Sequence, residues 1–127
     1  MMDDLRLELC RVCKLLYDRG YVAGHDGNVS VRVPEGILIT PSGVSKGRME
    51  PDMPVLCDME GNVLSWDRWP SSEMSMHLQV YKDRPDVNAV VHAHPPVSTA
   101  FAVCRRPLTE AYLIETVSGM KKCFLFS

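Results

Sequence analysis

The sequence of residues 89–95 is Ala89-Val90-Val91-His92-Ala93-His94-Pro95, and this stretch decides the expected fold. Its apolar, β-branched start predicts a buried strand of a sheet, which the proline ends. Side chains alternate between the faces of a strand, so His92 and His94 should point the same way, with Cα atoms roughly 6.5–7 Å apart. Two such imidazoles can converge on one metal ion. The alternative is a pair of polar residues at the solvent-facing end of a strand.

Size and composition limit the function classes. The 127 residues suit one domain or a part of a larger one, and the apolar fraction of 46% is typical of a globular protein. The net charge of −2 argues against a nucleic-acid partner, which requires a basic face. No apolar run is long enough to predict a membrane span. The acidic, amphipathic N-terminal stretch is unlike a secretory signal, so we expect a cytoplasmic protein with no membrane partner.

The cysteines favour reduced thiols over a disulfide framework, because their number is odd and their spacing is irregular. The five are Cys10, Cys13, Cys57, Cys104 and Cys123. The first two form a CxxC motif inside a helical pattern, without a second cysteine pair or a preceding strand. We interpret this motif as two small core-facing residues, with redox or metal chemistry as the alternative.

Hydrophobic periodicity predicts helices that interleave with hairpins. The expected helices cover roughly residues 3–19, from 70–73 to Pro85, 97–103 and 110–117. The expected hairpins pair residues 29–33 with 37–40 and residues 55–58 with 62–65 across turns that contain glycine. This arrangement predicts an α/β or α+β class with a mostly antiparallel sheet.

Three stretches are suited to hold an anion. Gly24-His25-Asp26-Gly27-Asn28 contains two glycines that permit positive φ, so its amides and the Asn28 side chain can form an anion-binding nest. Thr40-Pro41-Ser42-Gly43 is a turn with two hydroxyls and a glycine. Ser71-Ser72 is expected at the start of a helix, where N–H groups and the helix dipole favour a phosphate. Taken singly, each stretch is also explained as a hairpin turn, a strand exit or an ordinary helix cap.

Three titratable residues accompany these stretches. Glu73 directly follows the two serines and is either a carboxylate that complements the helix dipole or a general base. His77 falls on the apolar stripe of the same predicted helix, which favours a packed, hydrogen-bonded structural histidine. His25, in the glycine-rich stretch, either contacts the anion or is an exposed loop residue.

Four motifs together resemble the class II aldolase/adducin family, and most of all its fuculose-phosphate aldolase branch. In chain order they are Gly27-Asn28-Val29-Ser30-Val31-Arg32, Ile39-Thr40-Pro41-Ser42-Gly43, Pro70-Ser71-Ser72-Glu73 and the block from Arg84-Pro85-Asp86 to His92-Ala93-His94-Pro95. The resemblance covers roughly residues 3–117. We therefore expect residues 1–117 to form part of a domain of this family, followed by an atypical C-terminal tail over residues 118–127.

The resemblance implies a fold, a cofactor and a set of site residues. The fold would be a three-layer α/β/α sandwich around a mostly antiparallel sheet. The metal would be zinc (Zn2+), with His92 and His94 as two of its ligands and Glu73 as the acid/base carboxylate. Tyr112 resembles a tyrosine that the family lends to a neighbouring subunit's site, within a cyclic homotetramer. The residues implied to hold the substrate phosphate are Asn28, Ser42, Gly43, Ser71 and Ser72.

The chemistry implied is aldol cleavage of a sugar phosphate, in which a ketose 1-phosphate gives dihydroxyacetone phosphate and an aldehyde. Zinc would stabilise the enediolate as a Lewis acid, and Glu73 would shuttle the proton. Pentulose-phosphate 4-epimerisation and dehydration of methylthioribulose phosphate are alternatives on the same scaffold. An alternative of another class is a non-catalytic, adducin-like assembly module.

The sequence departs from the family's pattern at the metal. Family enzymes use a third histidine well downstream, and no histidine follows His94 in this sequence. A catalytic zinc normally has three protein ligands. We therefore expect a C-terminally incomplete domain that carries most of the first half of the site and is not an efficient aldolase by itself.

Overall fold

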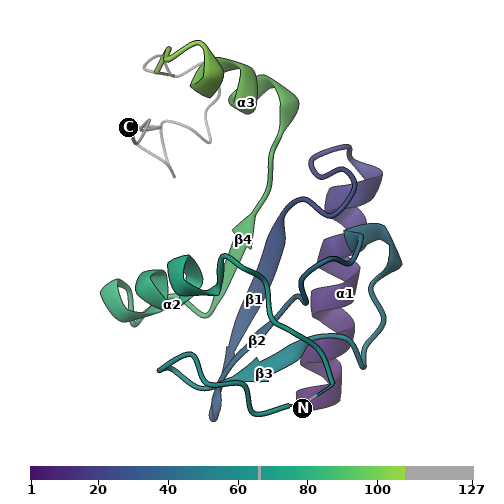
Figure 1. Ribbon diagram of the computed structural model, residues 1–127, viewed down its shortest axis with the longest axis vertical. Coiled ribbons are helices and arrows are strands. Elements are labelled where there is room, and N and C mark those ends of the chain that lie inside the picture. The colour runs from purple at the N-terminus through teal and green to yellow at the C-terminus, as the bar shows by residue number, and fades with distance from the viewer. Residues whose placement is uncertain (66, 108–127) are drawn as a thin grey trace. The chain divides into compact units, whose positions relative to one another are not determined.

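A computed structural model of the protein describes residues 1–65 and 67–107, in two units that are described separately (Figure 1). The elements of the first unit, Met1–His94, are α1 (Met2–Asp18), β1 (Asn28–Val33), β2 (Gly36–Ile39), the 3-10 helix η1 (Lys46–Arg48), β3 (Val55–Cys57), α2 (Met74–Asp83) and β4 (Ala89–His92). In the second unit, which begins at Pro95, the described helix is α3 (Pro96–Val103). No helix among the described residues has the length and apolar character needed to cross a membrane.

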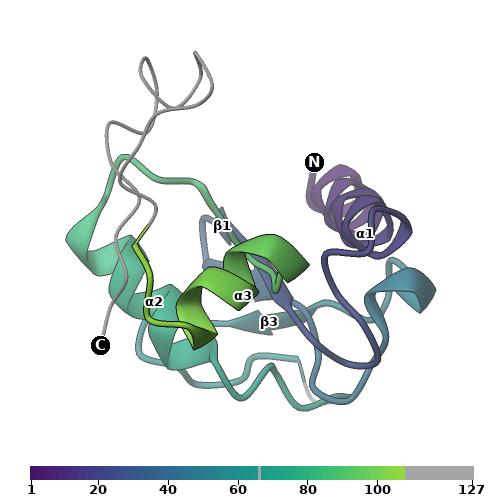
Figure 2. The same cartoon turned by 90° about the horizontal axis from the view of Figure 1, so that it is seen from above.

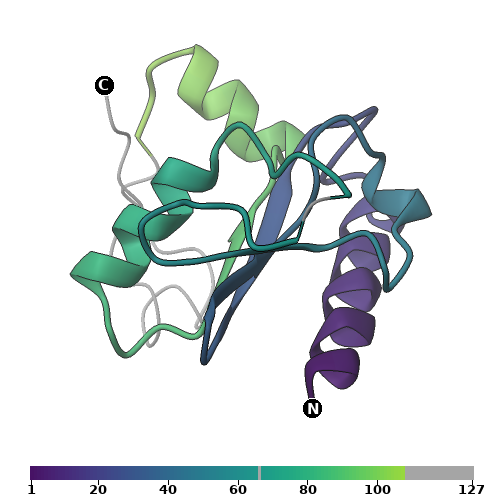
Figure 3. The same ribbon diagram turned by 60° about the horizontal axis from the view of Figure 1, so that its bottom comes forward.

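The four strands form one antiparallel sheet in the order β3-β2-β1-β4. The β1–β2 hairpin lies between the two long helices of the unit, as Figure 3 shows from below. Its neighbour β4 pairs with β1 in a register that sets Ser30 opposite Val90 and Asn28 opposite His92. The start of β1 and the end of β4 therefore lie side by side.

Helices cover both faces of this sheet, α1 on one and α2 on the other (Figure 2). Leu38 packs toward α1, while its neighbours Ile37 and Ile39 pack toward α2, and all three are fully buried. Because side chains alternate along a strand, this burial places β2 between two apolar layers. The α1 cluster adds Leu9, Cys13, Val29 and Val33, and the α2 cluster adds Val55, Cys57, Leu78 and Tyr81. The three-layer α/β/α architecture around an antiparallel sheet is confirmed.

The first helix and the first hairpin lie where the sequence predicts them. Residues 3–19 were expected to be helical and α1 covers Met2–Asp18, followed by Gly20 with a φ of +70°. The short helix predicted near residues 97–103 is present as α3. The helix predicted around residues 110–117, the domain boundary after residue 117 and the tail lie outside the described residues.

The second predicted hairpin is present only in part. The chain turns back after Val55–Cys57 and makes one antiparallel bridge, between Cys57 and Val63, but residues 62–65 do not form a strand. Backbone bonds from Asp58 N–H to the Asn62 carbonyl, at 3.0 Å, and from Leu64 N–H to the Leu56 carbonyl, at 2.8 Å, flank the bridge. The Asp58 side chain accepts hydrogen bonds from the backbone N–H of Glu60 at 3.0 Å and of Asn62 at 2.8 Å. These bonds close the turn. The ladder stops beyond it because the Leu56 N–H donates to the Ser65 hydroxyl, at 3.0 Å, and this side-chain bond competes with a backbone partner.

The strand that carries the histidine pair differs from the prediction in two ways. It was expected to be buried, but β4 pairs only with β1 among the described residues, and Val91 is 51% exposed. It also ends at His92 rather than His94. The reason is that the His94 N–H donates to the carbonyl of Tyr21 at 2.8 Å, outside the sheet. The two histidines therefore do not both belong to the strand.

The predicted start of the second helix is also wrong. The helix was expected to open at residues 70–73, but α2 begins at Met74 with Glu73 as its N-cap residue. The preceding residues are bound to the exit of β2 instead. The Ser71 N–H donates to the Thr40 carbonyl at 3.0 Å, and Pro70 bridges Pro41. Ser71 and Ser72 consequently lie in the turn before the helix.

Gly27 provides a test of the close approach between β1 and β4. An alanine Cβ there would meet Val22 Cγ1 at 2.4 Å and the His92 carbonyl oxygen at 2.9 Å, whereas one at Gly20 would meet nothing within 4 Å. Both glycines have positive φ. Gly20→Ala should therefore cost only about 1–2 kcal/mol of backbone strain. Gly27→Ala should cost roughly 1–3 kcal/mol more through overpacking.

Urea unfolding of both variants, compared with the parent chain, measures this difference. Equal losses of unfolding free energy in the two variants would show that the approach of Gly27 to β4 does not constrain the fold.

Candidate functional site

One pocket of about 350 Å³ in the first unit collects the site residues predicted within the described part of the chain. Its lining includes Asn28, Ser42, Gly43, Ser71, Ser72, Glu73, His92 and His94. His25, Asp26, Gly27, Pro41 and Lys46 complete it. These residues come from four separate segments, so the pocket is a product of the tertiary fold. The remaining predicted site residue, Tyr112, lies outside the described residues.

The two histidines of the predicted metal pair face each other although only one of them is in a strand. The centroids of their rings are 5.0 Å apart, with an angle of 64° between the ring planes. A tetrahedral zinc with nitrogens at about 2.0–2.1 Å would place two ligating ring centroids roughly 5 Å apart. The pair therefore fits two positions of a metal's donor set. No group of three or more histidine, cysteine or acidic side chains that could hold an ion occurs among the described residues.

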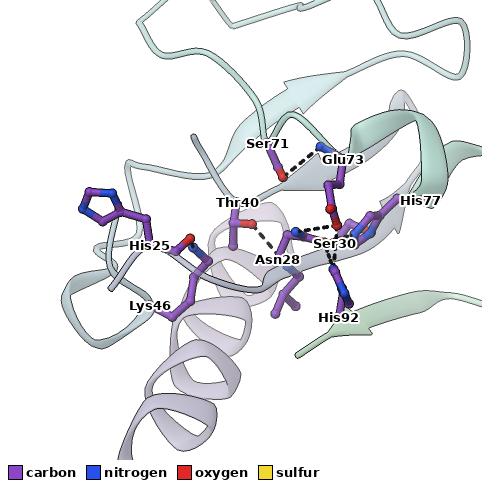
Figure 4. Close-up of polar contacts among 10 residues, drawn as sticks. His25, Asn28, Ser30, Thr40, Lys46, Ser71, Glu73, His77 and His92 are labelled. Carbon is purple, nitrogen blue, oxygen red and sulfur yellow. Dashed lines mark hydrogen bonds and ion pairs between the residues drawn. The ribbon is translucent and has the colours of Figure 1, made fainter. Parts of the chain in front are cut away.

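Glu73 lies beside His92, at the N-cap of α2 (Figure 4). Its Oε2 is 2.6 Å from His92 Nδ1 and accepts a hydrogen bond from Asn28 Nδ2 at 3.3 Å. The Glu73 side chain is 46% exposed and the His92 side chain 29% exposed. The carboxylate is thus held from one side by the protein and open from the other, as a group that exchanges a proton with a ligand must be.

The anion-holding stretches meet at this pocket through backbone contacts. Gly24, Gly27 and Gly43 adopt φ values of +52°, +74° and +71°, as the predicted nest and turn require. The turn after β2 is fastened to the segment before α2, because the Ser42 N–H donates to the Trp69 carbonyl at 2.9 Å. The stretch from Thr40 to Gly43 and the stretch that contains Ser71 and Ser72 are therefore held together independently of any ligand.

The prediction that Ser71 and Ser72 offer free N–H groups at a helix start needs correction for Ser71. The Ser71 N–H is bonded to Thr40, and the Ser71 hydroxyl accepts a hydrogen bond from the Glu73 N–H at 3.3 Å. What these serines present to the pocket is a turn with two hydroxyls, directly before the carboxylate.

Lys46 is a pocket residue that the sequence reasoning missed. Its side chain is only 2% exposed, and its ammonium donates to the carbonyl of His25 at 3.2 Å and to that of Val44 at 2.9 Å. It thus joins the loop before β1 to the loop after β2 (Figure 4). Burial lowers the pKa of Lys46. Lysine is usually a surface residue, so no local pattern signals this buried position.

His77 is confirmed as a packed, hydrogen-bonded histidine. It is fully buried between α2 and β1, where it contacts the side chains of Ser30 and Asn28. Burial, reinforced by the nearby His92 and opposed by Glu73, lowers the pKa of His77 to about 4. The ring is therefore neutral at pH 7. Its link to Asn28 was not predicted, because α2 and β1 are more than forty residues apart in the sequence.

The CxxC motif agrees with its structural interpretation in part. Cys13 is fully buried against the sheet, and burial raises the pKa of its thiol to about 12. Cys10 is half-buried, which is less than a core position implies. Raised thiol pKa values disfavour the reactive thiolate, so the contacts support packing rather than redox chemistry.

The low pKa of His77 predicts how stability depends on pH. The unfolded chain binds a proton near pH 6.5, whereas the folded chain resists it down to about pH 4. The free energy of unfolding should therefore fall as the pH drops through this window, by at most about 1.4 kcal/mol per pH unit. Urea titrations at several pH values should show a flatter profile for His77→Gln. The exposed control His25→Gln should keep the parent slope, and a loss of slope there instead would contradict the assignment.

Comparisons with known proteins agree with this geometry. Residues 7–124 match the family described as the Class II Aldolase and Adducin N-terminal domain. An L-fuculose phosphate aldolase of Methanococcus maripaludis is 42% identical over 101 residues, which cover 80% of this chain and 55% of the relative. A 5-methylthioribulose-1-phosphate/5-deoxyribulose-1-phosphate aldolase of Escherichia coli is 39% identical over 120 residues, which cover 93% of this chain and 56% of the relative.

A solved structure shares the fold. The L-fuculose-1-phosphate aldolase of Thermus thermophilus superposes with a TM-score of 0.79 at 32% identity, over 92% of this chain and 59% of that one. The chain spans about half the length of the curated relatives it matches. Together with the three-layer fold and the resemblance of its four motifs, these matches show that the chain belongs to the class II aldolase/adducin family.

Proposed function

We propose that the chain carries part of the site of a zinc-dependent lyase that cleaves a sugar phosphate, a ketose 1-phosphate, by retro-aldol chemistry. The observation that supports this most is the meeting of two imidazoles, one half-exposed carboxylate and the anion-holding turns in a single pocket. The names of the relatives, two aldolases of phosphorylated sugars, support the same reaction class.

In this proposal the phosphate end of the substrate binds at the turns. The amides around Gly43 and the hydroxyls of Ser42, Ser71 and Ser72 would donate to its oxygens, and the Asn28 side-chain NH₂ has a second N–H to add. Binding energy gained at the phosphate orients the carbon chain toward Glu73 and the histidines without acting on the reacting bond itself.

The reacting end of the substrate would lie beside the histidine pair and Glu73. When bound by His92 and His94, a zinc ion would supply Lewis acidity for the negative charge that develops as the C3–C4 bond breaks. Glu73 would move the proton to or from the carbon of the three-carbon fragment. Its position favours this role, because Asn28 holds the carboxylate while nearly half of the side chain stays exposed.

Further parts of the proposal rest on the family resemblance. Tyr112 would act as a proton donor in the site of a neighbouring subunit of a homotetramer, in the cytoplasm. Epimerisation of a pentulose phosphate and dehydration of methylthioribulose phosphate would use the same metal ligands. An adducin-like assembly module would need neither the histidine pair nor Glu73. The presence of all three in one pocket therefore favours the enzyme.

Metal binding tests the ligand assignment. The 127-residue chain should bind zinc in calorimetric titrations, and His92→Ala or His94→Ala should weaken binding by more than about 100-fold, beyond the usual effect of residues that only orient a ligand. His25→Ala is the matched control, because His25 lines the same pocket but has no proposed metal role. Zinc bound with parent affinity by both alanine variants would overturn the assignment.

Turnover tests the reaction class. A chain loaded with zinc should release dihydroxyacetone phosphate from a ketose 1-phosphate only slowly, because it carries only part of the site, and a chelator should abolish the release. Glu73→Gln should lower the rate of the zinc-saturated chain by about 10²–10⁴-fold, since general acid–base groups contribute on that scale. Zinc affinity should fall by no more than about 100-fold, the usual effect of a group that only orients a ligand. A Glu73→Gln variant as fast as the parent would contradict the proton-transfer role.

A further inference from the structure

A line of four buried polar side chains runs behind the pocket, from α2 to the start of β1. Ser30 and His77 are fully buried, while Tyr81 is 1% and Asn28 is 5% exposed. Burying so many polar groups is costly unless each is hydrogen-bonded. No buried side-chain nitrogen or oxygen of the described residues lacks a hydrogen-bond partner, so this line is fully satisfied.

The contacts along the line are short and continuous, and Figure 4 labels its members from Ser30 to Glu73. Tyr81 OH is 2.8 Å from Ser30 Oγ, and Ser30 Oγ is 2.7 Å from His77 Nδ1. His77 Nε2 is 2.5 Å from Asn28 Oδ1, and Asn28 Nδ2 is 3.3 Å from Glu73 Oε2. The line therefore ends on the carboxylate to which acid/base chemistry is assigned above.

The ionised carboxylate fixes the direction of every bond in the line. A carboxylate only accepts, so Asn28 must turn its NH₂ toward Glu73 and its Oδ1 toward His77. Asn28 Oδ1 then requires a proton from His77 Nε2, which leaves Nδ1 of the neutral ring as an acceptor. Ser30 must donate to that nitrogen and accept from Tyr81. A neutral ring is what the low pKa of His77 provides at pH 7.

We propose that His77 is a positioning residue for catalysis: with Ser30 and Tyr81 behind it, it locks the Asn28 amide in the orientation that holds Glu73. Asn28 Oδ1 also lies 3.3 Å from His92 Nδ1, but that nitrogen is nearer to Glu73 Oε2, at 2.6 Å, so His77 makes the short bond to the amide oxygen. Without the imidazole N–H of His77, only the longer contact would oppose rotation of the amide, which would bring its oxygen to face the carboxylate as a second acceptor. The role goes beyond packing, because an apolar side chain of the same size fills the space but removes the short bond to the amide oxygen.

The tautomer of His77 tests this directly and requires no substitution. Long-range ¹H–¹⁵N spectra of the ¹⁵N-labelled 127-residue chain at pH 7 should show His77 in the Nε2–H form. The Nδ1–H form, or an averaged mixture of the two, would overturn the proposal. This measurement does not depend on metal binding or turnover.

Two substitutions at His77 separate positioning from packing. His77→Phe keeps a ring but has no donor, whereas the amide of His77→Gln can still donate to Asn28. Hydrogen exchange of the Asn28 side-chain NH₂ should be about 5- to 10-fold faster in the phenylalanine variant, the factor expected for the loss of one hydrogen bond. It should return toward the parent rate in the glutamine variant.

Gln79→Ala is the matched control on the same helix, because Gln79 is exposed and bonds only to Asp83 among the described residues. It should leave the exchange of Asn28 unchanged. Parent-like exchange in a folded His77→Phe variant would contradict the proposal. If His77→Phe does not fold, the proposal is still tested by the tautomer of His77 and by the Asn28 exchange rate in His77→Gln.

A kinetic arm rests on the proposed function. His77→Phe should lower kcat about 10-fold or more with little change in KM, and the effect should disappear when Asn28 is already alanine, because both substitutions break the same link. An equal loss of kcat in the parent chain and in the Asn28→Ala chain would overturn the proposal. Absence of turnover in a zinc-loaded parent chain with the expected tautomer would instead contradict the proposed reaction.

Discussion

The pairing of β1 with β4, with Asn28 opposite His92, is the constraint on which the site depends. Because side chains alternate along a strand, a slip of one residue would turn His92 to the other face of the sheet. It would then lose its contacts with Glu73 and Asn28. The register itself relies on Gly27, whose missing side chain allows the His92 carbonyl to approach the start of β1. One backbone relationship thus determines whether the polar groups of the pocket can meet.

Local periodicity was enough to predict much of the fold. The apolar stripe of α1, the turn between β1 and β2 and the stripe of α2 each depend on residues close in the sequence, and each is present. The predicted site residues within the described part of the chain all line one pocket, while their roles stay predictions. They were grouped through the resemblance of four motifs to a family, whereas spacing alone left every one of these motifs open to a simpler explanation.

Contacts between distant segments account for what the sequence did not reveal. The strand β4 ends early because His94 bonds to Tyr21, and α2 starts late because Ser71 bonds to Thr40. Neither partner can be identified from periodicity. The same holds for Lys46, whose ammonium joins two loops, and for the bond from His77 to Asn28. These polar contacts fix the geometry of the site more than the apolar pattern does.

The fastening of the turn after β2 to the segment before α2 has an evolutionary consequence. Its bonds join Ser42 to Trp69 and Ser71 to Thr40 through main-chain atoms alone. Substitution of a side chain removes neither donor nor acceptor, unless proline is introduced. The half of the pocket that is proposed to bind phosphate can therefore persist while residues at the other end diverge. If that proposal holds, the scaffold can exchange one phosphorylated substrate for another without rebuilding the part that recognises the shared group.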